Sequence, residues 1–226
     1  MVVTPSSSPR GVIFDVDGTL VDSNDAHARA WLGAFREVGR EIDMAQIRPL
    51  IGMGGDKIIP KLLGVSEESE LGKRISSRRA EIFRSDYLPK VRAFPKVRDL
   101  ALRLRDSGVQ LGVASSAKPD ELQPLLKIAE IADLIEVETS SGDAESSKPD
   151  PDIIHAALSR LGLPPAQVFM VGDTPYDIAA AQAAGVNAIA FRCGGHSDDR
   201  LGGALAIYDG AAELLDHLSE SPIFRV

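Results

Sequence analysis

The chain has 226 residues, 44% of them hydrophobic and 26% charged, which is typical of a globular protein with a sizeable core. Its net charge of -8 argues against nonspecific binding to nucleic acid. No apolar run approaches the roughly 18–20 residues that span a bilayer, and the single cysteine, Cys193, excludes an internal disulfide framework. These features predict a cytoplasmic protein that acts on neither nucleic acid nor membranes; they do not indicate its oligomeric state.

The chain opens with a stretch, MVVTPSSSPR, that lacks the apolar segment of a signal peptide and predicts a loose tail. Short apolar runs with β-branched residues then predict strands at 11–15, 110–115, 134–138, 168–173, 186–191 and 205–209. Segments with helical periodicity lie between most of them. This alternation predicts an α/β fold, a Rossmann-like parallel sheet with helices on both faces.

One region interrupts the alternation. From about residue 23 to residue 91 the sequence is helical and rich in charge, and it contains no convincing strand. It predicts a small all-helical cap, inserted after the first strand, that could act as a lid. The expected division is a catalytic core of residues 1–22 and 92–226 and a cap of residues 23–91.

Capping residues mark the ends of two predicted core helices. In one, Asp150 is expected to cap, Pro151 to take the first helical position and Gly162 to end the helix. In the other, Thr174 is expected to cap ahead of Pro175, and Gly185 to close the helix.

Polar residues stand where several of the predicted strands end. Asp15 and Asp17 follow the first strand, Ser115 and Ser116 the second, and Asp173 a later one, while Lys148 precedes a helix. In an open α/β sheet these positions meet at one edge. Carboxylates so close together repel unless a cation lies between them, and three aspartates provide oxygen ligands suited to Mg²⁺.

Each of these residues also has a purely structural explanation. Aspartates are common in turns after strands, the two serines could cap the next helix, and Lys148 could be a surface lysine. Asp177 forms a T-x-x-D capping box with Thr174, which could explain it fully. The functional interpretation depends on all of these features falling at the same end of one sheet.

Four motifs in order, "DVDGT", the serine after "LGVA", the lysine in "SSKPDPDI" and "GDTPYD", resemble those of the haloacid dehalogenase superfamily. The resemblance covers nearly the whole chain, and the helical insertion is similar to the superfamily's small C1-type cap. His27 and Trp31 lie where members similar to phosphoglycolate phosphatase and β-phosphoglucomutase often have such residues.

The resemblance implies a phosphatase that acts on a small phosphorylated metabolite with Mg²⁺. Asp15 would be the nucleophile that forms an aspartyl-phosphate, and Asp17 the general acid and then base. The metal would be held by Asp15, Asp173 and the Asp17 carbonyl. The groups implied at the phosphate are Gly18, Thr19, Ser115, Ser116 and Lys148, with Asp177 and Thr174 behind them.

Two other activities and a non-catalytic role are the alternatives to a phosphatase. Asp17 argues against a dehalogenase, because a halide leaves without needing a proton. A phosphomutase of the β-phosphoglucomutase type is the main alternative, although Gly54-Gly55 and Gly172 stand where such mutases commonly have an arginine and a glutamate. A catalytically silent binding protein is the third possibility, and the complete set of carboxylates with Lys148 argues against it.

The cap is expected to select the substrate, through Gly54, Gly55, Lys57 and Arg79. A water-facing position is the structural alternative for Lys57, and it is the expected one for Arg78 and Arg79. His27 is expected to be an interface histidine near the hinge. Trp31 and Phe35, four residues apart, are expected to pack the cap helix.

Overall fold

The fold was analysed in a computed structural model that describes residues 11–225. The predicted loose tail lies outside these residues. Within them, six parallel strands form one sheet in the order β3-β2-β1-β4-β5-β6. The strands are β1 (Gly11–Phe14), β2 (Gln110–Ala114), β3 (Val137–Thr139), β4 (Val168–Gly172), β5 (Asn187–Phe191) and β6 (Ala206–Tyr208).

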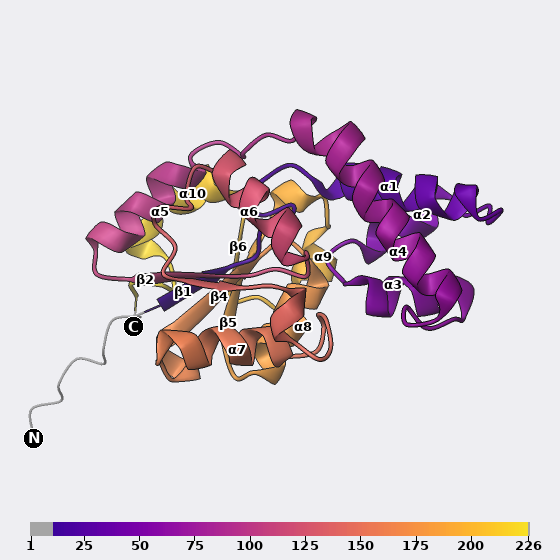
Figure 1. The fold of residues 1–226 in the computed structure, drawn as a ribbon. Helices are drawn as coiled ribbons and strands as arrows, with labels where there is room; N and C mark the ends of the chain where they lie inside the picture. Colours follow the sequence, from indigo (N-terminus) through magenta and orange to yellow (C-terminus); the bar gives the residue numbers. More distant parts are fainter. Residues whose placement is uncertain (1–10, 226) are drawn as a thin grey trace, which may run out of the picture.

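Helices cover both faces of the sheet (Figure 1). Side chains alternate along each strand, so Val12 and Phe14 enter one apolar cluster while Ile13 enters the other. The first cluster contains residues of α5 (Val97–Asp106), α6 (Pro119–Ile128) and α10 (Ala211–Asp216). The second is closed by α7 (Asp152–Leu161), α8 (Pro175–Ala183) and the short α9 (Asp198–Leu201). The predicted parallel sheet with helices on both faces is therefore confirmed.

Between β1 and α5 the chain is helical, as the sequence predicts. Its elements are α1 (Asn24–Glu37), α2 (Met44–Ile47), α3 (Gly55–Leu63), α4 (Glu70–Ile82), a π-helical turn (Phe83–Tyr87) and two 3₁₀ turns (Arg48–Leu50, Leu88–Lys90). We call the sheet and the helices that cover it the sheet half. In Figure 1 α1–α4 lie together beyond one edge of the sheet half. We call residues 23–91 the helical segment.

The chain enters and leaves the helical segment through two connections that lie side by side. Asp22 N donates to Arg92 O at 2.9 Å, and Phe94 N donates to Leu20 O at 3.0 Å. Val21 and Ala93 form an isolated antiparallel bridge between them. The two connections are therefore paired with each other where the helical segment begins and ends.

Two local predictions differ from the structure. The strand expected at 134–138 is β3, Val137–Thr139, because Leu134 packs into the core from a turn and contributes no strand pairing. Helix α7 begins at Asp152 with Pro151 as its N-cap, so Asp150 is not the cap. Gly162 ends that helix in the left-handed conformation, as expected.

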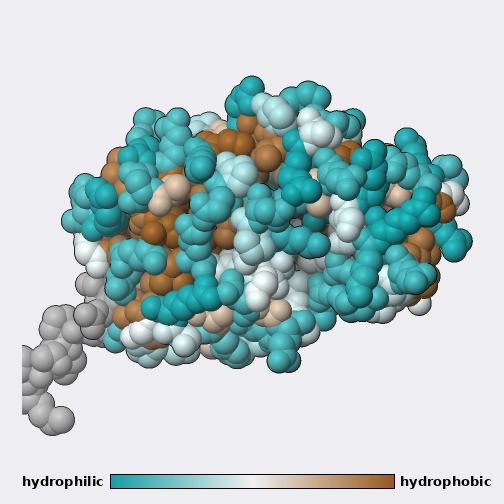
Figure 2. Space-filling view, viewed as in Figure 1, coloured by the Kyte–Doolittle hydropathy of each residue, from teal (hydrophilic) through white to brown (hydrophobic). Residues whose placement is uncertain are grey.

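The surface is mostly hydrophilic on the face drawn in Figure 2, and the larger hydrophobic areas there lie over the sheet half. Among the described residues, no helix has the length and apolar character that a membrane crossing requires.

Candidate active site

The carboxyl ends of β1 and β4 bring two aspartates together. Phe14 pairs with Val171 in the central part of the sheet, so Asp15 and Asp173 leave neighbouring strands side by side. The backbone N–H of Asp15 donates to Val171 O at 2.8 Å and fixes this register. The strand order reverses here, with β2 on one side of β1 and β4 on the other, which is where α/β folds bind ligands.

A third carboxylate, that of Asp177, joins the pair. Oxygens of Asp15, Asp173 and Asp177 lie within 4.8 Å of one another, and all three side chains are buried. Lys148 lies among them without any exposure; its Nζ donates to Asp15, to Asp177 at 2.7 Å and to Ala114 O at 3.1 Å. The surface-lysine explanation of Lys148 is therefore wrong.

Burial and charge shift the titration of this cluster. Burial raises the pKa of Asp15 well above its ordinary value, and the nearby Lys148 offsets only part of this. Burial, followed by the charge of Asp177, raises the pKa of Asp173 to about 7. Burial alone would lower the pKa of Lys148, but the charges of Asp15 and Asp177 outweigh it and raise it. The buried ammonium group of Lys148 thus hydrogen-bonds two of the three buried carboxyl groups and acts on the third, that of Asp173, through its charge.

Asp177 completes the capping box that the sequence predicts and also contacts Lys148. Its Oδ2 accepts hydrogen bonds from Thr174 N at 3.0 Å and Thr174 Oγ1 at 2.6 Å, which completes the capping box of α8. Its Oδ1 accepts from Lys148. Asp177 therefore positions the lysine from the first turn of α8, and Asp15 and Asp173, which follow neighbouring strands, are the carboxylates better placed to hold a metal ion.

The surroundings of Asp173 suit a hard cation. Thr19 Oγ1 donates to Asp173 Oδ1 at 2.9 Å and also lies 3.2 Å from Asp15 Oδ2, so this hydroxyl links the two carboxylates. Asn24 Nδ2 donates to Asp173 Oδ2 at 2.8 Å, while Asn24 Oδ1 is buried without a partner among the described residues. An all-oxygen set with excess negative charge and an unpaired amide oxygen fits Mg²⁺. Asn24 was missed because no spacing in the sequence links residue 24 to residue 173.

Asp17 faces the helical segment instead. Its Oδ1 accepts a hydrogen bond from Ser23 Oγ at 2.5 Å and lies 2.8 Å from His27 Nε2. Burial would raise the pKa of Asp17, but the charge and hydrogen bond of His27 and the Ser23 hydroxyl lower it overall. His27 stacks on Phe83 with ring centroids 3.8 Å apart. The expected interface histidine therefore also contacts the expected general acid.

Gly18 follows Asp17 with a φ of +82°, a conformation that favours glycine. A Cβ at this position would lie 2.0 Å from Asn24 Nδ2 and 2.3 Å from Asp173 Oδ2. Any side chain here would push both groups out of place, so the turn after Asp17 requires glycine.

The two serines after β2 do not cap α6, whose N-cap is Lys118. Ser115 is buried, and its Oγ accepts a hydrogen bond from Ala117 N at 3.0 Å. Ser116 Oγ donates to Gly52 O at 3.2 Å, which joins the end of β2 to the loop before α3. The capping interpretation of these serines is wrong.

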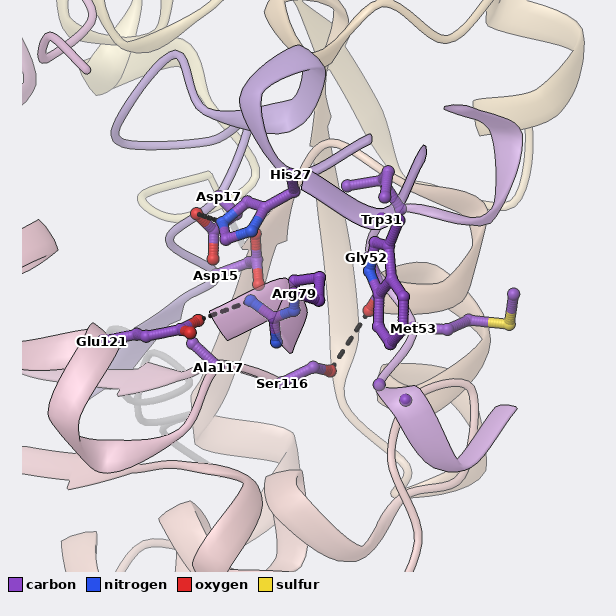
Figure 3. A pocket seen from close by; sticks show the side chains of 13 residues that line it. Asp15, Asp17, His27, Trp31, Gly52, Met53, Arg79, Ser116, Ala117 and Glu121 are labelled. Atoms are coloured by element: carbon purple, nitrogen blue, oxygen red, sulfur yellow. Dashed lines mark hydrogen bonds and ion pairs between the residues drawn. The ribbon is translucent and has the colours of Figure 1, made fainter. Parts of the chain in front are cut away.

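A small cavity of about 40 Å³ lies over Asp15 and Asp17 (Figure 3). Residues of the helical segment and of the sheet half both line it: Asp15, Asp17, His27, Trp31, Ile51, Gly52, Met53, Gly54, Gly55, Arg79, Ser116, Ala117 and Glu121. Of the four residues expected to select the substrate, Gly54, Gly55 and Arg79 line the cavity. Lys57 does not, because its Nζ pairs with Asp150 at 2.6 Å.

The structure agrees with some of the positions expected for cationic and aromatic residues of the helical segment and contradicts others. Arg78 is partly exposed and pairs with Glu37, close to the expectation. The water-facing position expected for Arg79 is wrong, because Arg79 is buried and pairs with Glu121 at 2.7 Å. Trp31 stacks on Phe35 with centroids 5.6 Å apart, as expected for packing, and it also lines the cavity. Sequence reasoning missed Glu121, since an acidic residue in the first turn of a helix is ordinary.

Comparison with known proteins agrees with this geometry. The sequence model described as haloacid dehalogenase-like hydrolase matches residues 12–191. A probable phosphatase of Dickeya dadantii, IndB, is 33% identical over 223 residues, covering 94% of this chain and 97% of that protein. A phosphoglycolate phosphatase of Rhodospirillum rubrum is 32% identical over 221 residues, covering 93% and 91%. The crystal structure of a hydrolase from Pseudomonas syringae superposes with a TM-score of 0.87 at 28% identity, covering 93% of this chain and 98% of that one.

Proposed function

Because the chain belongs to the haloacid dehalogenase-like hydrolase family, we propose that it hydrolyses a small phosphate monoester through an aspartyl-phosphate on Asp15. The observation that carries the proposal is the buried carboxylate of Asp15 at the floor of a cavity, paired with Lys148 and adjacent to Asp173. The relatives named as phosphatases support a phosphate ester as the substrate.

In this proposal each side chain of the site has a role. The Asp15 carboxylate attacks phosphorus and forms the new O–P bond, while Asp17 gives its proton to the departing alkoxide. Asp17 then accepts a proton from the water that cleaves the acyl phosphate and regenerates Asp15. Mg²⁺ held by Asp15, Asp173 and the Asp17 carbonyl would supply positive charge that offsets the repulsion between phosphate and carboxylate.

The phosphoryl oxygens need donors as charge moves onto them. Lys148 holds one Asp15 oxygen, and in this proposal it also neutralises the transferring group. The Ser115 hydroxyl accepts from Ala117 N, so its proton is free to donate to phosphate. The hydroxyls of Ser116 and Thr19 and the turn at Gly18 lie around the same strand ends, but these two hydroxyls would have to leave Gly52 O and Asp173 to donate to phosphate.

We assign the helical segment, residues 23–91, as a cap over a core of residues 1–22 and 92–226. The contact of His27 with Asp17 and the hydrogen bond from Ser116 to Gly52 O join the two parts directly over the cavity. A cap that closes in this way would exclude bulk water while the aspartyl-phosphate forms.

A phosphatase is favoured over a phosphomutase by the state of the cap cations. A mutase must hold the second phosphate of a sugar bisphosphate, and Lys57 is the lysine that closely follows Gly54 and Gly55, where such mutases commonly have an arginine. Its ammonium group is already paired with Asp150. Gly172, at the end of β4, also offers no carboxylate before Asp173.

The test is phosphate release from a panel of phosphomonoesters, with Mg²⁺ and with chelator, for the native protein and for Asp15→Asn. We expect turnover that requires Mg²⁺ and falls by at least roughly 10³-fold in the variant, since removing a nucleophile leaves only the contribution of binding. A folded Asp15→Asn protein that retains native turnover would contradict the mechanism. Isomerised product from a β-hexose 1-phosphate with its bisphosphate activator would favour the mutase.

A further inference from the structure

One wall of the cavity, beside Asp15, is an ion pair between the two parts of the molecule. Arg79 comes from α4 and Glu121 from the first turn of α6, with Arg79 Nη1 2.7 Å from Glu121 Oε2. Both residues are buried, and Figure 3 shows the guanidinium and the carboxylate facing each other beside Asp15. The wall therefore carries no net charge.

Each partner keeps one unpaired polar atom. Among the described residues, Arg79 Nε and Glu121 Oε1 are buried and have no hydrogen-bond partner. Buried polar atoms without partners are uncommon in native proteins, and a ligand is one way to satisfy them. A hydroxyl group can donate to Glu121 Oε1 and accept from Arg79 Nε, whereas a carboxylate or phosphate oxygen can only accept.

A second anionic group on the substrate has little to pair with nearby. The charge of Arg79 is already neutralised by Glu121, and its guanidinium lies 5.2 Å from the Trp31 ring. Lys57 pairs with Asp150, away from the cavity.

A hollow beside the cavity is lined by more acidic than basic side chains. This hollow has a volume of about 300 Å³ and shares Gly54, Gly55, Arg79 and Ser116 with the cavity. Its lining contains four acidic side chains and two basic ones: Asp56, Glu67, Glu68 and Glu145, with Lys118 and Arg79. This balance disfavours anions beyond the one phosphate that the catalytic centre binds.

Taking the proposed phosphatase activity as given, we propose that Glu121 determines substrate specificity by neutralising Arg79. The site then accepts a neutral, hydroxyl-bearing leaving group and rejects one with a carboxylate or a second phosphate near the ester. Glu121 acts on the leaving group and has no part in the chemistry at phosphorus.

The experiment compares two substrates that differ in one group. Glycerol 3-phosphate ends in a neutral CH₂OH, and 3-phosphoglycerate has a carboxylate at the same carbon. We expect native kcat/KM to favour glycerol 3-phosphate by about tenfold or more, because an uncompensated anion would face Glu121. With p-nitrophenyl phosphate as a third substrate, absence of Mg²⁺-dependent turnover on all three would refute the phosphatase proposal itself.

Two variants should shift this preference in opposite directions. Glu121→Gln frees the charge of Arg79 and should lower the glycerol 3-phosphate preference about tenfold, through a gain on 3-phosphoglycerate. Arg79→Gln leaves the charge of Glu121 unpaired and should strengthen the preference for glycerol 3-phosphate. Damage to the fold would lower turnover of both substrates together, so the ratio separates specificity from stability.

Asp120→Asn is the matched control. Asp120 precedes Glu121 in α6 and pairs with Arg84 of the helical segment at 2.5 Å, but it is exposed and does not line the cavity. Its ratio should stay within about twofold of the native one, as expected for an exposed pair. Native preference for 3-phosphoglycerate, an unchanged ratio in Glu121→Gln, or an equal shift in Asp120→Asn would overturn the assignment, as would turnover of p-nitrophenyl phosphate alone.

Discussion

Replacing Lys148 with methionine should destabilise the metal-free protein strongly. Methionine keeps most of the length and apolar volume of the lysine stem, so the change removes the charge and leaves little space. It leaves Asp15 and Asp177 buried without their shared cation. Breaking a buried ion pair by removing one partner costs about 3–5 kcal/mol, because the remaining charge has lost both water and counter-ion.

That loss would be a large part of the total stability, since globular proteins unfold at a cost of about 5–15 kcal/mol. For a chain of this length each kcal/mol lowers Tm by about 2–4 °C, which gives a fall of roughly 6–20 °C. Lys148 lowers the pKa of Asp15, so its removal raises that pKa further. A carboxyl group whose pKa is raised on folding stabilises the fold at low pH, and that contribution is lost as pH rises. The deficit should therefore be larger at pH 8 than at pH 5.

The assay is urea unfolding followed by circular dichroism, in chelator, at both pH values. Lys61→Met serves as the control because Lys61 is an exposed lysine of α3, and its stability should change by less than about 0.5 kcal/mol. Adding Asp177→Asn to Lys148→Met should recover part of the loss, since one unpaired charge disappears. A Lys148→Met protein within 1 kcal/mol of the native one at pH 8, or a deficit larger at pH 5, would refute the reasoning about the cluster.

Two further predictions concern the metal. Because burial and Asp177 raise the pKa of Asp173 to about 7, the metal-free fold loses stability as pH rises from about 4 through 7, and Mg²⁺ should restore it there. Thermal unfolding should therefore show a larger Mg²⁺-induced increase in Tm at pH 8 than at pH 5.5; equal increases would contradict this, and Asp173→Asn should abolish them. Asn24→Ala removes the amide that donates to Asp173 and should weaken Mg²⁺ binding roughly 10-fold by calorimetry, whereas unchanged affinity would exclude Asn24 as a positioning residue.

The order of elements was predictable because local signals and the fold agree. β-branched runs, helix caps and glycine stops alternate along the sheet half, and a parallel sheet covered by helices buries runs that are apolar on both faces. The prediction failed where tertiary packing decided the outcome. Leu134 is apolar and buried, yet it packs from a turn ahead of β3. A sequence pattern reports burial more directly than it reports strand pairing.

The site was predictable to the extent that its residues follow strand ends. Asp15 and Asp173 adjoin because parallel strands deliver their carboxyl ends to one edge, which the fold class alone implies. Asn24 and Glu121 were not predictable, since each reaches the site from a helix whose placement over the sheet depends on packing at a distance. The charge partner of Arg79 was equally hidden, because residue 121 is 42 positions away along the chain.

Helix α1 carries one residue that contacts Asp17 and another that lies beside the ion pair of Arg79 and Glu121. His27 and Trp31 are four residues apart, so they lie on the same face of the helix one turn from each other. His27 contacts Asp17, and Trp31 lies beside Arg79 of the wall. A movement of α1 away from the sheet would take His27 from Asp17 and Trp31 from the cavity together. The lowered pKa of Asp17 depends on the charge and hydrogen bond of His27, so the proton affinity of the expected general acid depends on how closely the helical segment approaches. Because contact with His27 lowers the pKa of Asp17, closure of α1 over the cavity would weaken the hold of Asp17 on its proton, which favours transfer of that proton to the leaving group in the proposed mechanism.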